Sequence, residues 1–135
     1  MKSNRSRRNA MLLFLLIMAS TPVIAQSTHG ASIVFASQTY DFDTIYQGDE
    51  CIAMFTYKNT GDLPLTLFEV KSSCGCTIPS WSNIPLAPGD SLSIKVRYDS
   101  STLGSFRKTI LVKSNAINKQ KTILRIKGIV VKKQK

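Results

Sequence analysis

The sequence predicts an all-β fold, an antiparallel sandwich of about seven strands preceded by a signal peptide, and three observations support it. Short segments in which apolar and polar residues alternate recur after residue 31. Turn-forming Gly, Pro and Asn residues separate these segments. No stretch after Ala25 carries apolar side chains at helical spacing. Several short strands at regular spacing are typical of a two-sheet sandwich.

Residues 1–25 have the three parts of a secretory signal peptide. Basic residues precede the apolar run 10–18, and a small residue, Ala25, follows. The apolar run is shorter than the roughly 20 residues that a membrane-spanning helix needs. We therefore expect cleavage after Ala25 and an exported protein, in the periplasm or outside the cell, with no membrane span after cleavage. No cysteine lies at the junction, which argues against a lipid-modified N-terminus.

The mature chain has the size of one domain. Residues 26–31 are small and polar and predict a flexible leader. The only histidine, His29, lies in this leader, so we expect it to be solvated rather than to act as a ligand or base. Residues 32–135 contain no internal repeat and predict a single β-sandwich domain.

The strands of the first half alternate with clear turns. Residues 32–35 and 39–45 are short β-rich segments, and Tyr40 and Phe42 give the second an aromatic face. Residues 50–59 are apolar on both faces, which predicts a central strand. An Asn-Thr-Gly-Asp turn follows, and Pro64 restarts the chain at a strand edge.

The second half continues the pattern. Residues 65–71 form a strand that runs into the cysteine segment, and residues 84–90 are a proline-stiffened connection. Residues 91–98 alternate most cleanly, and strands at 106–113 and 119–131 complete the domain. We expect the first strand (32–35) and the last (119–131) to be open sheet edges, where a partner's extended segment can pair.

Basic residues exceed acidic ones, and the last strand turns Lys121, Arg125 and Lys127 to the same side. This predicts a basic face that steers acidic partners, an envelope protein or a polysaccharide, although a merely solvated face fits the same pattern. Nucleic acid is disfavoured as a partner, because the basic residues lie at strand spacing rather than along an aromatic-lined groove. Trp81 is either an exposed recognition residue or a cover for the open end of the sandwich.

Three cysteines in an exported chain imply oxidising conditions and one unpaired thiol. Their pairing stays open, because Cys51, Cys74 and Cys76 allow three bridges. The interpretations are a structural staple, a thiol-redox site at Cys74 and Cys76, or a Cu(I) site that adds Cys51 or Met54. Zinc is disfavoured for lack of a fourth ligand. No catalytic or cofactor motif appears, so we expect a non-enzymatic module without a cofactor.

The combined motifs resemble the bacterial "domain of unknown function 1573" family. They are Tyr-Asp-Phe-Asp-Thr-Ile (40–45), Asn-Thr-Gly-Asp (59–62), Ser-Cys-Gly-Cys-Thr (73–77), Ile-Pro-Leu-Ala-Pro-Gly (84–89), Ser-Asn (114–115) and Leu-x-Ile-x-Gly (124–128). The resemblance covers about residues 38–131 and implies an immunoglobulin-like sandwich of the PapD and Hydin kind, without an assigned activity. The sequence departs from the family at Asp43, where Gly is usual, and at Cys51, which lies outside the family motif.

Overall fold

The computed structural model describes Pro22 and residues 29–135. Within this part of the chain all regular structure is β, and no helix is long and apolar enough to cross a membrane. Apart from Pro22, the predicted signal peptide (1–25) lies outside the described residues, as do residues 26–28 of the predicted leader.

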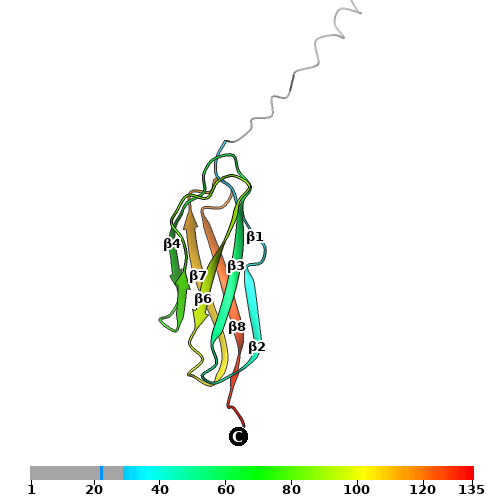
Figure 1. Cartoon of the computed structure of the whole chain (residues 1–135), viewed down its shortest axis with the longest axis vertical. Coiled ribbons are helices and arrows are strands. Elements are labelled where there is room, and N and C mark those ends of the chain that lie inside the picture. Colours follow the sequence, from blue (N-terminus) through cyan, green and yellow to red (C-terminus); the bar gives the residue numbers. More distant parts are fainter. Residues whose placement is uncertain (1–21, 23–28) are drawn as a thin grey trace, which may run out of the picture.

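Eight strands run along the long axis of the molecule (Figure 1). They are β1 (Ile33–Phe35), β2 (Thr39–Tyr46), β3 (Cys51–Asn59), β4 (Leu67–Ser72), β5 (Thr77–Ser80), β6 (Ser91–Tyr98), β7 (Gly104–Ser114) and β8 (Lys121–Val131). The strand missing from the sequence prediction is β5, which follows the cysteines and pairs with β6. It has only four residues and includes Pro79, so it carries no alternating pattern long enough to predict a strand.

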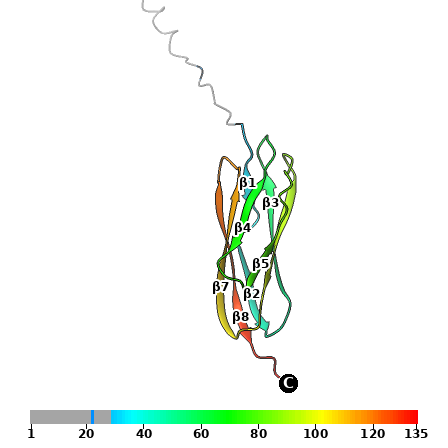
Figure 2. The same ribbon diagram turned by 90° about the vertical axis from the view of Figure 1, so that its left-hand side faces the viewer.

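The strands form two four-stranded sheets in the orders β1-β3-β6-β5 and β2-β8-β7-β4. Figure 2 shows the sheets as two layers, with β4 and β5 at the edge that faces the viewer. Every pairing is antiparallel except β2 with β8, which is parallel. The fully antiparallel prediction is therefore corrected at this pair. The chain keeps its direction as it passes from β1 in one sheet to β2 in the other, and so it meets β8 in parallel.

The position of the strands in the sheets decides which backbone edges are open. β3 is central, between β1 and β6, as predicted, and β1 is an edge. The prediction that the last strand is also an edge is wrong, because β8 lies between β2 and β7. The parallel pairing of β2 covers the side of β8 that would otherwise be open.

The core lies between the sheets and takes alternate residues from each long strand. Ile94 and Val96 of β6 and Leu124 and Ile126 of β8 belong to this core, all at 0% exposure. Burial of such side chains stabilises the fold by about 1.5–3 kcal/mol each. The inward faces predicted from alternation are thus confirmed at these four residues, whereas Leu92, which the alternation also predicts to face inward, is 38% exposed near the start of β6.

The packed domain begins before Ser32, inside the predicted leader. Ala31 is 3% exposed, and its carbonyl accepts the Ile117 N–H at 2.8 Å. Gly30 is buried and exchanges backbone and side-chain hydrogen bonds with Asp62. These two residues are therefore part of the domain and not of a flexible leader. His29 is exposed, as expected, but its ring contacts the Asp62 carboxylate.

Candidate functional site

The cysteine segment forms the turn in which the chain passes from β4 in one sheet to β5 in the other. Cys74 and Cys76 are joined in a disulfide with a Cα–Cα distance of 5.4 Å, and both are half-buried. Gly75 between them has open space around its Cα, so the ring is free of steric contact there. A loop this small adds only about 1.5 kcal/mol of chain-entropy stabilisation. The bridge is thus a weak staple.

Cys51 is the free thiol and does not join this group. It is 3% exposed on the inner face of β3, and burial raises the pKa of its thiol. In the sheet register Tyr98 of β6 lies between Cys51 and Thr77, so a full strand separates Cys51 from the disulfide turn. No cross-strand bridge from Cys51 forms.

The residues proposed for a Cu(I) site are not brought together. Cys74 and Cys76 hold their sulfurs in the disulfide, Cys51 points into the core, and Met54 is 52% exposed on the outside of β3. Within residues 29–135 no three His, Cys, Asp or Glu side chains are arranged to hold a metal ion. The oxidised form described here therefore offers no such site.

The outer surface of the sheet β2-β8-β7-β4 gathers basic side chains from three strands. Residues opposite one another in the register share a face, and β8 pairs Lys121 with Lys113 and Lys127 with Arg107. We call this surface the basic face. Its members are Lys71, Arg107, Lys113, Lys121, Arg125 and Lys127.

Three carboxylates lie at the rims of the basic face: Glu69 and Asp41, which form ion pairs, and Asp43, which lines a hollow together with Arg107 and Lys127. Glu69 of β4 meets Lys113 at 2.9 Å, and hydrogen bonding to Lys113 lowers the pKa of Glu69. Asp41 of β2 meets Lys127 at 3.5 Å. Among the described residues no carboxylate forms an ion pair with the four remaining cations, which are Lys71, Arg107, Lys121 and Arg125. The surface therefore keeps an excess of unneutralised positive charge.

The structure joins three of the four residues predicted for a binding face. Lys121, Arg125 and Lys127 share the outer side of β8. Trp81 does not join them, because it follows β5 in the other sheet and packs, half-buried, against the core. Sequence reasoning missed Arg107, Lys113 and Lys71. The alternation of β7 indicates that Arg107 and Lys113 face outward, but only the pairing of β7 with β8 shows that they extend the same face.

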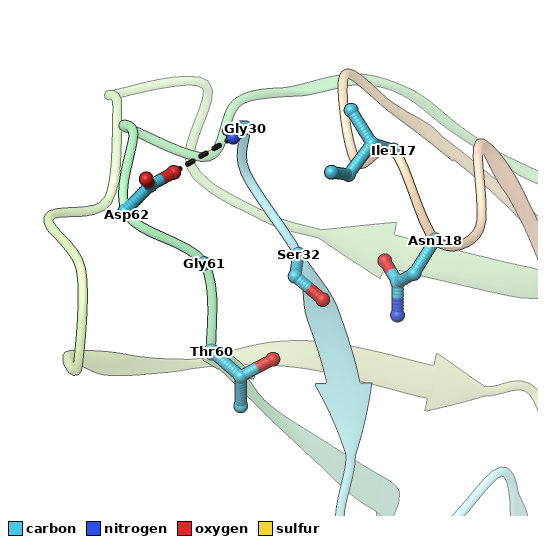
Figure 3. A pocket seen from close by; sticks show the side chains of 7 residues that line it. All are labelled: Gly30, Ser32, Thr60, Gly61, Asp62, Ile117 and Asn118. Atoms are coloured by element: carbon cyan, nitrogen blue, oxygen red, sulfur yellow. Dashed lines mark hydrogen bonds between the residues drawn. The ribbon is translucent and has the colours of Figure 1, made fainter. Parts of the chain in front are cut away.

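A hollow of about 560 Å³ lies at the end of the sandwich near Gly30 (Figure 3). Gly30 approaches the turn between β3 and β4, where the Asp62 Oδ1 accepts the Gly30 N–H at 2.7 Å. On the other side Asn118 accepts the Ile33 N–H at 3.0 Å and donates to the Ile33 carbonyl at 2.9 Å. Asparagine and aspartate side chains thus hold the N-terminal segment to the sandwich.

Asn59, the last residue of β3, lies at the same end of the sandwich and is 0% exposed. Its amide nitrogen donates to the Leu63 and Leu86 carbonyls at 2.8 and 2.9 Å. Its oxygen accepts the Gly61 N–H at 3.0 Å. A Cβ on Gly61 would lie 2.1 Å from the Gly30 carbonyl oxygen, so only glycine fits. Every polar group of the Asn59 side chain is used inside the protein, and nothing is left for a ligand.

The sequence matches the family described as "Protein of unknown function (DUF1573)" over residues 33–130. The chain belongs to this family. Comparison with curated proteins finds no match.

Solved structures similar to this DUF1573 chain share its fold. A protein of unknown function from Porphyromonas gingivalis W83 aligns with a TM-score of 0.67 at 17% identity, covering 75% of this chain and 47% of that one. This chain therefore corresponds to about half of that protein's length. The PapD-like domain 7 of human CEP192 aligns with a TM-score of 0.66 at 10% identity, covering 87% and 99%. The YadV chaperone aligns with a TM-score of 0.52 at 17% identity, covering 76% and 53%. Identities this low show an immunoglobulin-like, PapD-like sandwich and nothing further.

Two DUF1573 motif positions have structural explanations. Asp43, at the position where the family resemblance implies glycine, has φ = 58° at a bulge in β2, the left-handed region that glycine adopts readily. Aspartate tolerates this region better than most residues, and the Asp41 carboxylate accepts the Asp43 N–H at 2.8 Å. Gly128 leaves room for the Phe106 ring, which would lie 3.0 Å from a Cβ there. Asp43 thus serves the backbone of the bulge, and Gly128 serves the packing of the Phe106 ring.

Proposed function

We propose that this chain is an exported, non-enzymatic binding module that holds an acidic partner protein against its basic face. The observation that supports the proposal is the gathering of six Lys and Arg side chains on one sheet surface, where the carboxylates of Glu69 and Asp41 are already paired. A surface with unneutralised charge of one sign raises the association rate of partners of the opposite sign.

A face suits this sandwich better than an edge as the binding site. β1 is three residues long, the bulge at Asp43 interrupts β2, and Pro79 removes a donor from β5. β4 is six residues long and has its own irregularity between Leu67 and Glu69. None of these edges offers a long, regular row of backbone groups for an added strand.

Apolar residues within the basic face favour a protein over a polysaccharide as the partner. Ile123 and Leu111 form the row next to the pair of Lys121 and Lys113. Ile123 is 37% exposed and Leu111 is half-buried. Contact with apolar groups removes these side chains from water and so favours binding. A protein surface supplies such groups, whereas a hydroxyl-rich sugar chain largely lacks them.

The test compares two charge-reversed variants on opposite surfaces. One carries Lys121→Glu, Arg125→Glu and Lys127→Glu, and the control carries Lys58→Glu, Lys95→Glu and Arg97→Glu on the outer face of the other sheet. Poly-L-glutamate and the carboxylated polysaccharide polygalacturonate serve as defined probes, and proteins captured from envelope extract are then identified and titrated. We expect the first variant to lose at least tenfold in affinity for poly-L-glutamate and for the captured protein.

The control variant should keep most of its affinity, and binding should weaken with added salt. Equal losses in both variants would show that net charge alone drives binding and would overturn the proposal. Tighter binding to polygalacturonate than to any captured protein would replace the protein partner with a polysaccharide.

A further inference from the structure

The disulfide turn is held firmly from both sheets, although the ring itself is half-buried. The Ser73 N–H donates to the Thr109 carbonyl of β7 at 2.9 Å. The Asp99 N–H, just after β6, donates to the Cys76 carbonyl at 2.8 Å. The Ser72 hydroxyl donates to the Cys74 carbonyl at 2.8 Å. The two sulfurs therefore occupy fixed positions relative to their surroundings.

The two sulfurs are not equivalent. The Cys76 backbone N–H donates to the Cys74 sulfur at 3.2 Å, and no backbone donor among the described residues contacts the Cys76 sulfur. The buried Thr77 hydroxyl lies 3.9 Å from the Cys74 sulfur and 3.8 Å from the Cys76 sulfur. A donor directed at a sulfur stabilises the thiolate that forms there when the bond breaks, and a more stable thiolate leaves faster. Cys74 is thus the better leaving group.

Access also distinguishes the two cysteines. A cavity of about 290 Å³ is lined by Cys76, by Lys108 and Arg107 of β7, and by the loop between β6 and β7, whereas Cys74 does not line it. Asp99 is the one carboxylate among the lining residues, against the two cations. A small molecule in this cavity lies against Cys76, and the cations favour an anionic one.

We propose that the Cys74–Cys76 disulfide is a redox-active site that exchanges with small anionic thiols entering the cavity beside Lys108. The incoming thiolate attacks the Cys76 sulfur and forms a new disulfide with it. The Cys74–Cys76 bond breaks, and its electron pair goes to the Cys74 sulfur. This site shares Arg107 with the basic face, but the exchange needs neither the other five cations of that face nor the partner proposed for it.

A second molecule of the thiol completes the exchange. Its thiolate attacks the sulfur of the first molecule, and the Cys76 thiolate leaves. Two thiol molecules are thereby oxidised to one disulfide, and their two electrons and two protons end on Cys74 and Cys76. Cys51 takes no part, because β6 separates it from the ring.

The first measurement is the position of attack. The oxidised protein is mixed with 2-mercaptoethanesulfonate, quenched with acid and then alkylated, and the peptides are analysed by mass spectrometry. We expect the thiol adduct on Cys76 and the alkyl group on Cys74. An adduct mainly on Cys74, or divided evenly between the two, would overturn the proposal.

The second measurement is the charge preference of the rate. Anionic 2-mercaptoethanesulfonate, neutral 2-mercaptoethanol and cationic cysteamine are compared at equal thiolate concentration, each relative to its rate with a Ser-Cys-Gly-Cys-Thr disulfide peptide. We expect the folded protein to prefer the anionic thiol over the cationic one at least fivefold. Lys108→Gln should remove most of this preference and change the rate with the neutral thiol less than twofold.

Lys71→Gln is the matched control, since it removes one positive charge shortly before the ring but outside the cavity. It should keep most of the preference for the anionic thiol. If the folded protein shows no charge preference, or if Lys71→Gln and Lys108→Gln reduce it equally, the cavity does not select the thiol and the proposal fails. Circular dichroism of each variant establishes that it is folded.

Discussion

Two motifs of the DUF1573 family, Asn-Thr-Gly-Asp (59–62) and Ser-Cys-Gly-Cys-Thr (73–77), lie in turns that connect strands but differ in what their side chains do. In the first, the Asn59 amide and the Asp62 carboxylate satisfy backbone groups, and Gly61 gives the Gly30 carbonyl room to approach. In the second, Cys76 lines a cavity, and a Cβ added at Gly75 would meet no atom within 4 Å. The first motif is explained by the fold alone, and the second retains side-chain chemistry that the fold does not require.

The largest expected effect is a difference in the free energy of unfolding between alanine variants of Gly61 and Gly75, one from each motif. Gly61→Ala should lower the free energy of unfolding by about 2–4 kcal/mol, because its Cβ would lie 2.1 Å from the Gly30 carbonyl oxygen and the N-terminal segment would have to move. Gly75→Ala, the control, meets no atom within 4 Å and should change it by about 0.5 kcal/mol or less. Urea unfolding measures both, and equal losses would contradict the distinction.

A smaller effect is expected from removing the disulfide. The double variant Cys74→Ser, Cys76→Ser should fold and lose about 1.5 kcal/mol or less, because the bridge closes a very short loop. Wild type with and without reductant provides the control. A double variant that fails to fold would make the second motif as structural as the first.

The smallest effect concerns pH and Asp62. Hydrogen bonds from His29 and then from the Gly30 N–H lower the pKa of the Asp62 carboxyl. A group with a depressed folded pKa stabilises the protein above its unfolded value, about 3.9, and loses this contribution as pH falls through the folded value. Wild type should therefore have a higher Tm than Asp62→Asn at pH 5, and the gap should close below about pH 4.

His29→Ala sharpens this result, because it removes the first hydrogen bond and keeps the one from Gly30. Its Tm at pH 5 should lie between those of wild type and Asp62→Asn. A gap that stays constant from pH 5 to pH 2 would show that the Asp62 charge has no part in holding the N-terminal segment.

Local patterns predict much of the fold, and pairings between distant strands account for what they miss. The inward faces of β6 and β8 are predicted because alternation is a property of each strand alone. The neighbours of β8 depend on where β2 docks, and because β2 lies near the other end of the domain sequence, no local pattern encodes this. β5 has only four residues and contains Pro79, so its sequence shows no alternating pattern and is typical of a turn.

The candidate sites divide in the same way. The outward side of β8 predicts Lys121, Arg125 and Lys127, but the register with β7 is needed to add Arg107 and Lys113. Three cysteines leave the disulfide pairing open, and only the separation of β3 from the turn settles that Cys51 is the free thiol. Lys108 and Cys76 line the same cavity because β7 runs beside the disulfide turn. These two segments are distant in sequence, so no local pattern predicts that they lie together.

Of the five changes of sheet along the chain between β1 and β8, two join edge strands, from β1 to β2 and from β4 to β5. Each side of the sandwich therefore has two edge strands, one from each sheet. Proteins polymerise into fibrils when long, flat edge strands of different copies pair. Here the longest edge is β2, and Asp43 bends it at its centre. We therefore expect this protein to stay soluble at concentrations at which sandwiches with continuous edges aggregate. The bulge at Asp43 is thus expected to protect the folded protein from amyloid-like assembly.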